Sequence, residues 1–462
     1  MSLKKLLNLS HDIVHHDSNA IVWSENEKSI FRVFFIYVLF LCLPLSPKFY
    51  EYLINIDWAT FDCRDLFVVA TARHLDLISI ANESGRWGAA GYLELLLPLI
   101  LSIPIAWIWG QFECNNANYN KLNYWIRAIA RYRLGIGLVA WGYRKLLPGQ
   151  MVLPTIGVLN TPMGDFQAQK LYWQAVGITP GYEVFLGFAE FIAGFLLLFR
   201  RTTTLGSALG FVVLLNIVIA NHVYDGGVHL HSFYYVILSL FILWPDVPKI
   251  WNLIHNETNS QLKRFYPVIT NNWLKYLRIS LKFITFSVFV VLFFFMQVAD
   301  YVFTPYRIPD TPGLQGATGY YKVSEFKLNG EDIPYSPLDS LRWQDAIFEK
   351  WSTLNFKVNR LASIDQSNGG GHSEDDFDRK WEVAGMGGGR RSYYYEADTI
   401  KKILHLRNKN EGHTHEKQIL HYSRPDENRI ILTGINEFND SIYVVLDRQK
   451  RQYQFENHYA KQ

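Results

Sequence analysis

Two stretches decide the fold: YRLGIGLVAWGYRKLLP at 132–148 and GYEVFLGFAEFIAGFLLLFRRTTTLGSALGFVVLLNIVIANHVYD at 181–225. Both are apolar enough to cross a membrane as helices, yet both carry ionisable side chains. A charge within the bilayer costs ~3 kcal/mol or more on insertion scales, so such side chains usually face a bundle interior or a wet cavity. The region from Tyr132 to Pro245 is therefore the first place to expect a site.

Hydropathy predicts a multi-pass membrane protein. The chain has 462 residues, of which 49% are hydrophobic. Seven segments are long and apolar enough to cross ~30 Å of hydrocarbon as helices. They lie near residues 30–46, 88–112, 124–147, 182–200, 204–222, 230–247 and 277–303.

Lysine and arginine predict the orientation. They cluster before the first span, at the start of the third, between the fourth and fifth, and between the sixth and seventh. These clusters fall on one side if the spans alternate, and that side is the cytoplasmic one. We therefore expect a bacterial inner-membrane protein with a cytoplasmic N-terminus and a periplasmic C-terminal domain.

The outer loops are themselves rich in apolar residues. The loop at 47–87 contains a 10-to-14-residue apolar stretch, which is too short to span and indicates an interfacial or re-entrant helix. The loop at 148–180 is expected to lie on the outer membrane surface, as a lid over the bundle.

These observations predict six parts of the chain. They are a cytoplasmic N-terminal segment (1–29), two helices with a long external loop (30–123), a four-helix core (124–248), a cytoplasmic loop (249–276), a seventh span (277–303) and a periplasmic β-rich domain (305–462).

The last part has the pattern of an antiparallel β-domain. Short runs that read as strands are separated by turn-rich pieces, which predicts a meander closing into a small barrel or sandwich, lipocalin-like by fold analogy. A helix is expected near 340–352. The expected strands are YYKVSEFKLNG, RKWEVAG, RSYYYEAD, KKILHLRN, KQILHYSR, RIILTGIN, SIYVVLDR and RQYQFEN.

Composition excludes several classes of function. The net charge of +3 and the lack of a recognition motif argue against nucleic acid as a partner. The three cysteines form no CxxC, which argues against a dithiol redox centre. Cys42 and Cys63 could pair or stay buried thiols.

Two polar motifs lie in the expected β-domain. SNGGGHSEDDFD at 367–378 is better read as a solvated loop than as a calcium site. His413 and His415 are better read as part of a polar turn.

The fourth span places carboxylates on a small-residue face. Glu183, Gly187, Glu190 and Gly194 lie on one helical stripe. Glycines let a neighbouring helix approach closely, so the carboxylates are expected to point at protein. Glu190 lies near mid-span and needs a proton or a cation.

The third span supplies the candidate cations. Arg144 and Lys145 end it on the outer side, against the positive-inside trend, so a local partner is expected among Glu183, Glu190 and Asp225. Two alternatives stay open. The cations could snorkel to outer headgroups, and Glu190 could be a protonated packing residue.

The fifth span and the turn after it complete the constellation. The span carries Asn216, Asn221 and His222, and the turn is expected to bring Tyr224, Asp225, His229 and His231 to the outer rim. His229 and His231 are about 200° apart on a helix, so they cannot ligate one ion together. His222 and His229 could do so, but no metal site is predicted.

These motifs resemble the DoxX-like membrane proteins over about 125–248. The shared pattern is an R…G…G…K helix, an acidic glycine helix and a short Arg–Thr turn before the next helix. The likeness is to long bacterial forms with an outer β-domain. It implies a DoxX-like four-helix core, a link to quinone-dependent membrane redox systems, and matching family positions for Lys145 and Glu190.

Two functions follow from these expectations. In the first, a quinone or other lipid-soluble ligand enters from the outer leaflet, and Lys145, Glu190 and His222 handle protons. Arg144, Glu183, Asn216, Asn221, Tyr224, Asp225 and His229 would line the site. No flavin, haem or iron–sulfur motif is present, so electrons would come from a partner or substrate. In the second, the helices anchor a membrane complex and the β-domain binds a periplasmic protein.

Overall fold

The computed structural model describes residues 23–72, 88–113, 118–257, 265–303, 307–367, 369 and 375–453. Residues 1–22 of the expected N-terminal segment therefore lie outside the described residues, and α2 (Glu25–Cys42) begins within the rest of it. The chain forms two compact units. The helical unit comprises Met1–Leu146 and Phe185–Gln297, and the β unit comprises Leu147–Val184 and Val298–Gln462.

The long helices of the helical unit match the predicted spans. Six candidate membrane-spanning helices occur among the described residues. The 27-residue α6 is long enough to cross as well. Its arginines and lysines make it less apolar than the other six helices, so it is not among the candidates. The helices are α2 (Glu25–Cys42), α3 (Pro47–Asn55), α4 (Cys63–Thr71), η2 (Ala89–Tyr92), α5 (Leu93–Gln111), α6 (Asn120–Leu146), α9 (Pro180–Leu198), α10 (Thr203–Val223), α11 (His229–Leu243), η4 (Trp244–Asp246), α12 (Val247–His255), and α13 (Asn272–Phe286) continued by η5 (Ser287–Leu292) and α14 (Phe293–Phe303).

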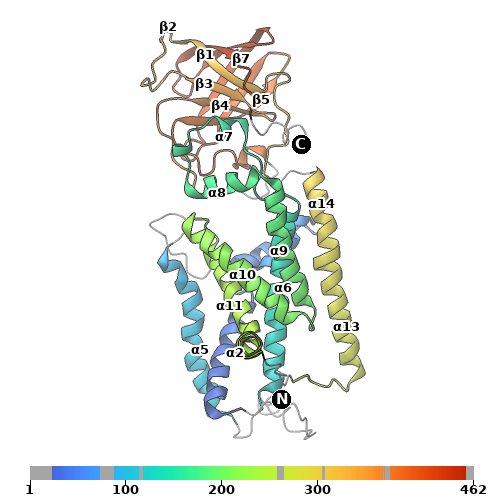
Figure 1. The fold of residues 1–462 in the computed structure, drawn as a ribbon. Coiled ribbons are helices and arrows are strands. Elements are labelled where there is room, and N and C mark those ends of the chain that lie inside the picture. Colours follow the sequence, from blue (N-terminus) through green and yellow to red (C-terminus); the bar gives the residue numbers. More distant parts are fainter. Residues whose placement is uncertain are drawn as a thin grey trace. The chain divides into compact units, whose positions relative to one another are not determined.

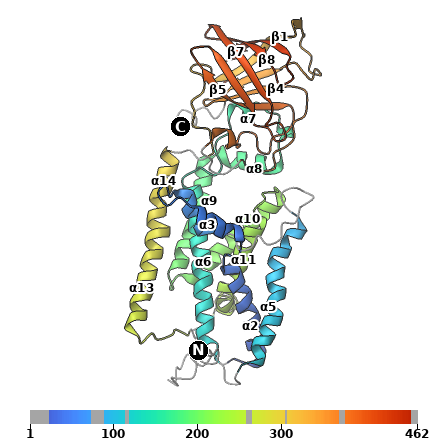
Figure 2. The ribbon, with the colours of Figure 1, turned by 180° about the vertical axis from the view of Figure 1, so that it is seen from behind.

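Figures 1 and 2 show α5 and α13 on opposite flanks of the helical unit, with α6, α10 and α11 between them. The buried core of this bundle is aliphatic and aromatic, and includes Leu41, Leu134, Leu138 and Tyr234. The flanking helices also expose large apolar side chains, as expected of helices that face lipid. Ile103 on α5 and Phe283 on α13, for example, are 56% and 70% exposed.

Glycines bring α6 and α9 into close contact, as the stripe on α9 predicts. A Cβ added at Gly194 would lie 2.7 Å from the carbonyl oxygen of Gly135. A Cβ added at Gly187 would lie 2.8 Å from the carbonyl oxygen of Gly142. Only glycine fits at such separations, so the small residues fix the spacing of these two helices.

The short helix α4 confirms the prediction of a non-spanning apolar helix in the first loop. It packs against α6 and buries four of its nine residues. Arg133 of α6 donates hydrogen bonds to the carbonyl oxygens of Ala70 and Thr71, each at 2.9 Å, and to that of Ala72. A cation at a helix C-terminus satisfies its last carbonyls and complements its dipole.

The β unit is built on a closed antiparallel barrel. Strands β1 and β3 to β9 pair in sequence order, and β1 also pairs with β9, which closes the sheet. The strands are β1 (Gly319–Leu328), β2 (Glu331–Asp332), β3 (Asp345–Phe348), β4 (Thr353–Lys357), β5 (Arg390–Asp398), β6 (Ile403–Asn408), β7 (Lys417–Asp426), β8 (Arg429–Ile435) and β9 (Ser441–Arg448). The expected barrel is confirmed, and the β1–β9 pairing joins two strands that would otherwise be edges.

Aromatic side chains fill the barrel. Trp343 stacks on Phe356 with ring centres 3.8 Å apart, and Phe356 stacks on Tyr393 at 5.3 Å. Tyr321, Tyr395 and Leu420 in the same cluster are fully buried. An eight-stranded barrel is just wide enough for side chains to fill it or for one small ligand, and here side chains occupy the core.

Three local predictions for this unit were wrong. The helix expected at 340–352 is instead a turn followed by β3, whose four residues are all buried between β1 and β4. The run RKWEVAG forms turns, closed by the amide of Ala384 donating to the carbonyl of Lys380 at 2.9 Å. The described part of RQYQFEN, residues 451–453, is not a strand. In the first case, pairing of β3 with β1 and β4 overrides the local helical pattern.

The segment 147–184 packs against the barrel, which the sequence did not predict. It carries α7 (Ile156–Leu159), η3 (Met163–Asp165) and α8 (Ala168–Gly177), all coloured green in Figure 1. Arg390 of β5 joins the two parts. Its guanidinium donates to both carboxylate oxygens of Asp345 at 2.9 and 3.2 Å, to Thr161 Oγ1 at 2.9 Å and to the carbonyl of Asn160 at 2.9 Å. The expected role of this segment as a lid over the helices stays a prediction.

Candidate functional site

Lys145 and Glu190 form a buried ion pair in the helical unit. Lys145 Nζ lies 2.8 and 2.9 Å from the two carboxylate oxygens of Glu190. The two residues are 7% and 2% exposed. The prediction that a cation at the C-terminal end of α6 finds a carboxylate partner is confirmed, and the partner is Glu190 on α9. Gly187 makes this possible, because a Cβ there would lie 2.7 Å from Lys145 Cβ.

Aromatic side chains extend this pair across the bundle. Lys145 Nζ lies 5.6 Å from the centre of the Trp141 ring, and Trp141 Nε1 donates to His231 Nε2 at 3.3 Å. The His231 ring in turn lies 4.6 Å from that of Tyr235. We call these five residues, Lys145, Glu190, Trp141, His231 and Tyr235, the Lys145 cluster. It brings together a cation, a carboxylate, an imidazole and a phenol from α6, α9 and α11.

Sequence reasoning missed Trp141 and Tyr235. The signal for Trp141 was present, since Gly137, Trp141 and Lys145 recur every four residues and share a helix face. A Cβ added at Gly137 would lie only 2.0 Å from the Tyr235 hydroxyl oxygen. Gly137 therefore makes room for the phenol of Tyr235. Its position on the same helix face as Trp141 and Lys145 could have indicated this role.

His222 lies in a second group, with His229 and Tyr92. The Tyr92 hydroxyl bonds His222 Nε2, and His222 Nδ1 lies 2.7 Å from the carbonyl oxygen of Val218. The rings of His222 and His229 are 5.2 Å apart. His229 and His231 thus face different groups, as their helical angle predicts. Among the described residues, no set of three or more His, Cys, Asp or Glu could hold a metal ion.

The other predicted residues have different surroundings. Glu183 is fully buried and accepts hydrogen bonds from the amides of Gln150 and Met151 at 3.1 and 3.0 Å, so it stabilises the turn after α6. Arg144 is buried, with its guanidinium 4.9 Å from the centre of the Phe67 ring. Its burial argues against snorkelling to headgroups.

Asn216, Asn221, Tyr224 and Asp225 do not converge as a group on the Lys145 cluster. Asn216 is exposed on α10, and Tyr224 is 39% exposed. Asn221 and Asp225 shape the turn that follows α10. The amide of Gly226 donates to the Asn221 carbonyl at 2.8 Å, and Asp225 has a φ of 52°.

Cys42 and Cys63 are buried thiols, and Cys63 Sγ donates to Gln297 Oε1 at 3.3 Å.

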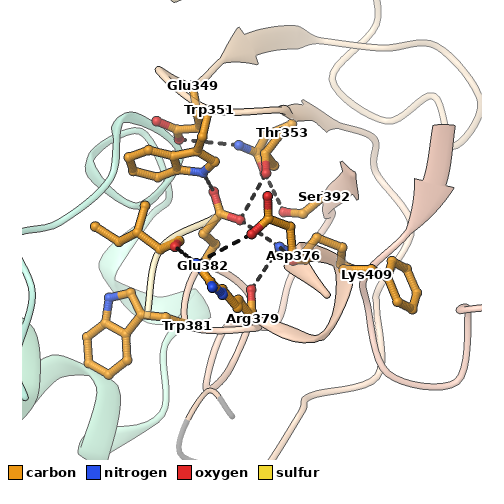
Figure 3. A network of polar contacts seen from close by, with 12 residues as sticks. Glu349, Trp351, Thr353, Asp376, Arg379, Trp381, Glu382, Ser392 and Lys409 are labelled. Carbon is orange, nitrogen blue, oxygen red and sulfur yellow. Dashed lines mark hydrogen bonds and ion pairs between the residues drawn. The ribbon is translucent and has the colours of Figure 1, made fainter. Parts of the chain in front are cut away.

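A second polar network, which sequence analysis did not predict, lies in the β unit (Figure 3). Lys409 is fully buried and bonds Glu382 Oε2 at 3.1 Å and the carbonyl of Arg379 at 2.8 Å. Glu382 also accepts from Trp351 Nε1 and from Thr353 Oγ1 at 3.0 Å. Because its partners satisfy this ion pair, we interpret it as structural.

Glu349 connects this network to the segment 147–184. It accepts from the amide of Gly157 at 2.6 Å and that of Ile156 at 3.2 Å. Burial, reinforced by the nearby charge of Glu382, raises the pKa of Glu349 from 4.5 to about 8. The polar turn expected around His413 and His415 is confirmed, and His413 Nδ1 lies 2.7 Å from Glu416 Oε1.

Comparison with known proteins identifies a family but no activity. The chain is 32% identical over 135 residues to the uncharacterized protein YwoB of Bacillus subtilis, covering 29% of this chain and 84% of that protein. The chain belongs to the YwoB family. No protein-family model matches the chain, and no solved structure matches it. Because YwoB is described as uncharacterized, the likeness supplies no substrate, and any function has to be argued from the Lys145 cluster.

Proposed function

We propose that the chain is a component of a membrane redox system that binds a quinone, or another lipid-soluble carbonyl compound, at the Lys145 cluster. The buried Lys145–Glu190 pair carries this proposal. Ionisable residues within a membrane bundle are costly and are usually retained for ligand or proton pathways. The resemblance of 125–248 to DoxX-like proteins points in the same direction.

The chemistry of the cluster suits such a ligand. A quinone has a flat ring and two carbonyl oxygens that accept hydrogen bonds. Trp141 offers an aromatic face, while Lys145, His231 and Tyr235 carry potential donors. In this proposal the residues of the chain bind the ligand and exchange protons with it. A partner redox protein supplies or removes the electrons.

The proposal is tested by ligand binding to the full chain in lipid nanodiscs. The probe is decylubiquinone, and the variant is Lys145→Met combined with Glu190→Gln, which removes the pair without leaving a lone charge. A matched control is Lys327→Met with Glu325→Gln, which removes an exposed pair of the same length, 2.9 Å. We expect the first variant to lose affinity roughly tenfold or more, as truncating a buried hydrogen-bonded group does, while the control binds normally. Equal binding by both variants would refute the proposal.

A second candidate is a scaffold function, favoured by the barrel. Its core is filled by Trp343, Phe356 and Tyr393, so the β unit would act through its outer surface and through the segment docked on it. In this case the helices anchor a complex and the β unit binds a protein partner outside the bilayer. Chemical cross-linking in intact membranes, followed by purification, distinguishes the two. A stable multisubunit assembly that forms equally well with the Lys145→Met/Glu190→Gln variant would favour the scaffold.

A further inference from the structure

Four cationic side chains gather where the start of α6, the α9–α10 turn and α13 meet: Arg131, Arg200, Arg278 and Lys282. Lys282 is within electrostatic range of the other three, and Arg131 is within range of Arg200. Like charges at such distances repel one another. An anion bound among them would relieve this repulsion.

Tyrosine rings link and orient two of these cations. Arg278 Nη2 donates to the Tyr124 hydroxyl at 3.0 Å, and Arg200 lies 4.2 Å from the centre of the Tyr266 ring. The rings of Tyr124 and Tyr266 are 6.4 Å apart and meet edge to face. Tyrosine is enriched at membrane–water interfaces, where its ring lies at the level of the lipid headgroups.

Arg131 is oriented toward the same turn. Its Nη1 donates to Thr203 Oγ1 at 3.4 Å, and its guanidinium lies 5.0 Å from the centre of the Tyr132 ring. By contrast, the adjacent Arg127 donates at 2.7 Å to the carbonyl of Ile242, near the end of α11. Arg127 thus has a structural task, whereas the four clustered cations meet no carboxylate within the described part of the chain.

The surface beside the cluster is apolar and exposed. On α13, Ile279 and Phe283 flank Lys282 and are 62% and 70% exposed. Figures 1 and 2 show α13 on the flank of the helical unit. A ligand reaching these cations thus meets hydrocarbon-binding surface next to positive charge, which suits an amphiphile better than a free ion.

We propose that Arg131, Arg200, Arg278 and Lys282 form a binding site for the phosphodiester headgroup of an anionic phospholipid, whose acyl chains lie along the exposed face of α13. Guanidinium groups pair with phosphate through two parallel hydrogen bonds, and the ammonium of Lys282 adds a point charge. The site is independent of the proposed ligand at the Lys145 cluster. It makes bilayer composition a determinant of the stability of the helical unit.

The test is native mass spectrometry of the full chain with short-chain phosphatidylglycerol, using phosphatidylcholine as the zwitterionic comparison. The variant carries Arg200→Gln, Arg278→Gln and Lys282→Gln. The matched control carries Lys121→Gln, Lys249→Gln and Lys275→Gln, three exposed cations on the side predicted to be cytoplasmic. We expect the cluster variant to bind phosphatidylglycerol roughly tenfold or more weakly, since each lost cation weakens attraction to anionic lipid. The control should bind as the unmodified chain does.

Equal losses in both variants would overturn the proposal, because the attraction would then be general surface charge. Displacement of phosphatidylglycerol by an equal concentration of inorganic phosphate would overturn it too, since a free ion would then be the better occupant. If the triple variant does not fold, Arg200→Gln with Lys282→Gln replaces it, because both side chains are exposed. Undiminished binding by that double variant would likewise refute the site.

Discussion

Lys145 Nζ sits between the two carboxylate oxygens of Glu190, at 2.8 and 2.9 Å, in the interior of the helical unit. Breaking such a pair leaves one buried charge uncompensated, which costs roughly 3–5 kcal/mol, whereas removing both charges is often neutral. We expect Glu190→Leu to lower the thermal unfolding temperature of the helical unit sharply, and the double variant with Lys145→Met to restore most of it. Additive losses in the double variant would show that the two groups act independently.

The close packing of α6 and α9 can be tested at one glycine. Gly194→Ala places a methyl group 2.7 Å from the carbonyl oxygen of Gly135, so the helices must separate. Overpacking of this kind costs about 1–3 kcal/mol. Gly181→Ala in the same helix is the control, since a Cβ there meets no heavy atom within 4 Å. Thermal unfolding in detergent measures both, and equal stabilities would contradict the packing described.

The buried carboxyl of Glu349 predicts a pH dependence of stability. Its pKa is about 8 in the folded chain against 4.5 ordinarily, so the folded state binds this proton more tightly. Its contribution to stability is therefore fully present below pH 4.5 and is lost as the pH rises toward 8. Glu349→Gln should flatten the fall of unfolding temperature across this interval. Glu325→Gln, whose side chain is 41% exposed, should keep the original slope. An unchanged slope for Glu349→Gln would contradict the assignment.

Arg390 holds the segment 147–184 to the barrel. Lysine keeps the charge but cannot reproduce the fork that reaches Asp345, Thr161 and Asn160 together. Arg390→Lys should therefore destabilise the β unit by roughly 1–3 kcal/mol and speed trypsin cleavage within 147–184, as read by mass spectrometry. Arg429→Lys alters an exposed pair with Asp447 and should change neither quantity appreciably. Equal cleavage rates would show that other contacts suffice.

The membrane helices were predictable because the thickness of the bilayer fixes the length of the apolar run that each helix needs. A run of about 20 apolar residues is hard to mistake, and every predicted span corresponds to a helix. The Lys145–Glu190 pair could also be predicted. Glu190 and Lys145 each lie in an apolar span, where a charged group needs a partner of opposite charge. The aromatic neighbours of this pair were harder to predict. Trp141 is indicated only by its four-residue spacing from Gly137 and Lys145, and nothing comparable indicates Tyr235.

The β unit shows where sequence reasoning ends. Long strands with turn signals were predicted, but the four-residue β3 and the five-residue β4 (TLNFK) were not. Such short segments gain their structure from pairing on both sides rather than from local pattern. The docking of 147–184 depends on single buried contacts across more than 190 residues, such as Glu349 with Gly157. Helix or strand periodicity in the sequence does not predict a contact between residues so far apart in the chain.

The most direct test of the proposed function is photoaffinity labelling of the full chain in nanodiscs with an azido-quinone, followed by peptide mapping. If the Lys145 cluster is the ligand site, the label should attach to α6 and α11 near Trp141 and Tyr235. Excess unlabelled quinone should then suppress it, and the Lys145→Met/Glu190→Gln variant should lose it. Label spread along the outward faces of α5 and α13, unaffected by competitor or variant, would contradict the account.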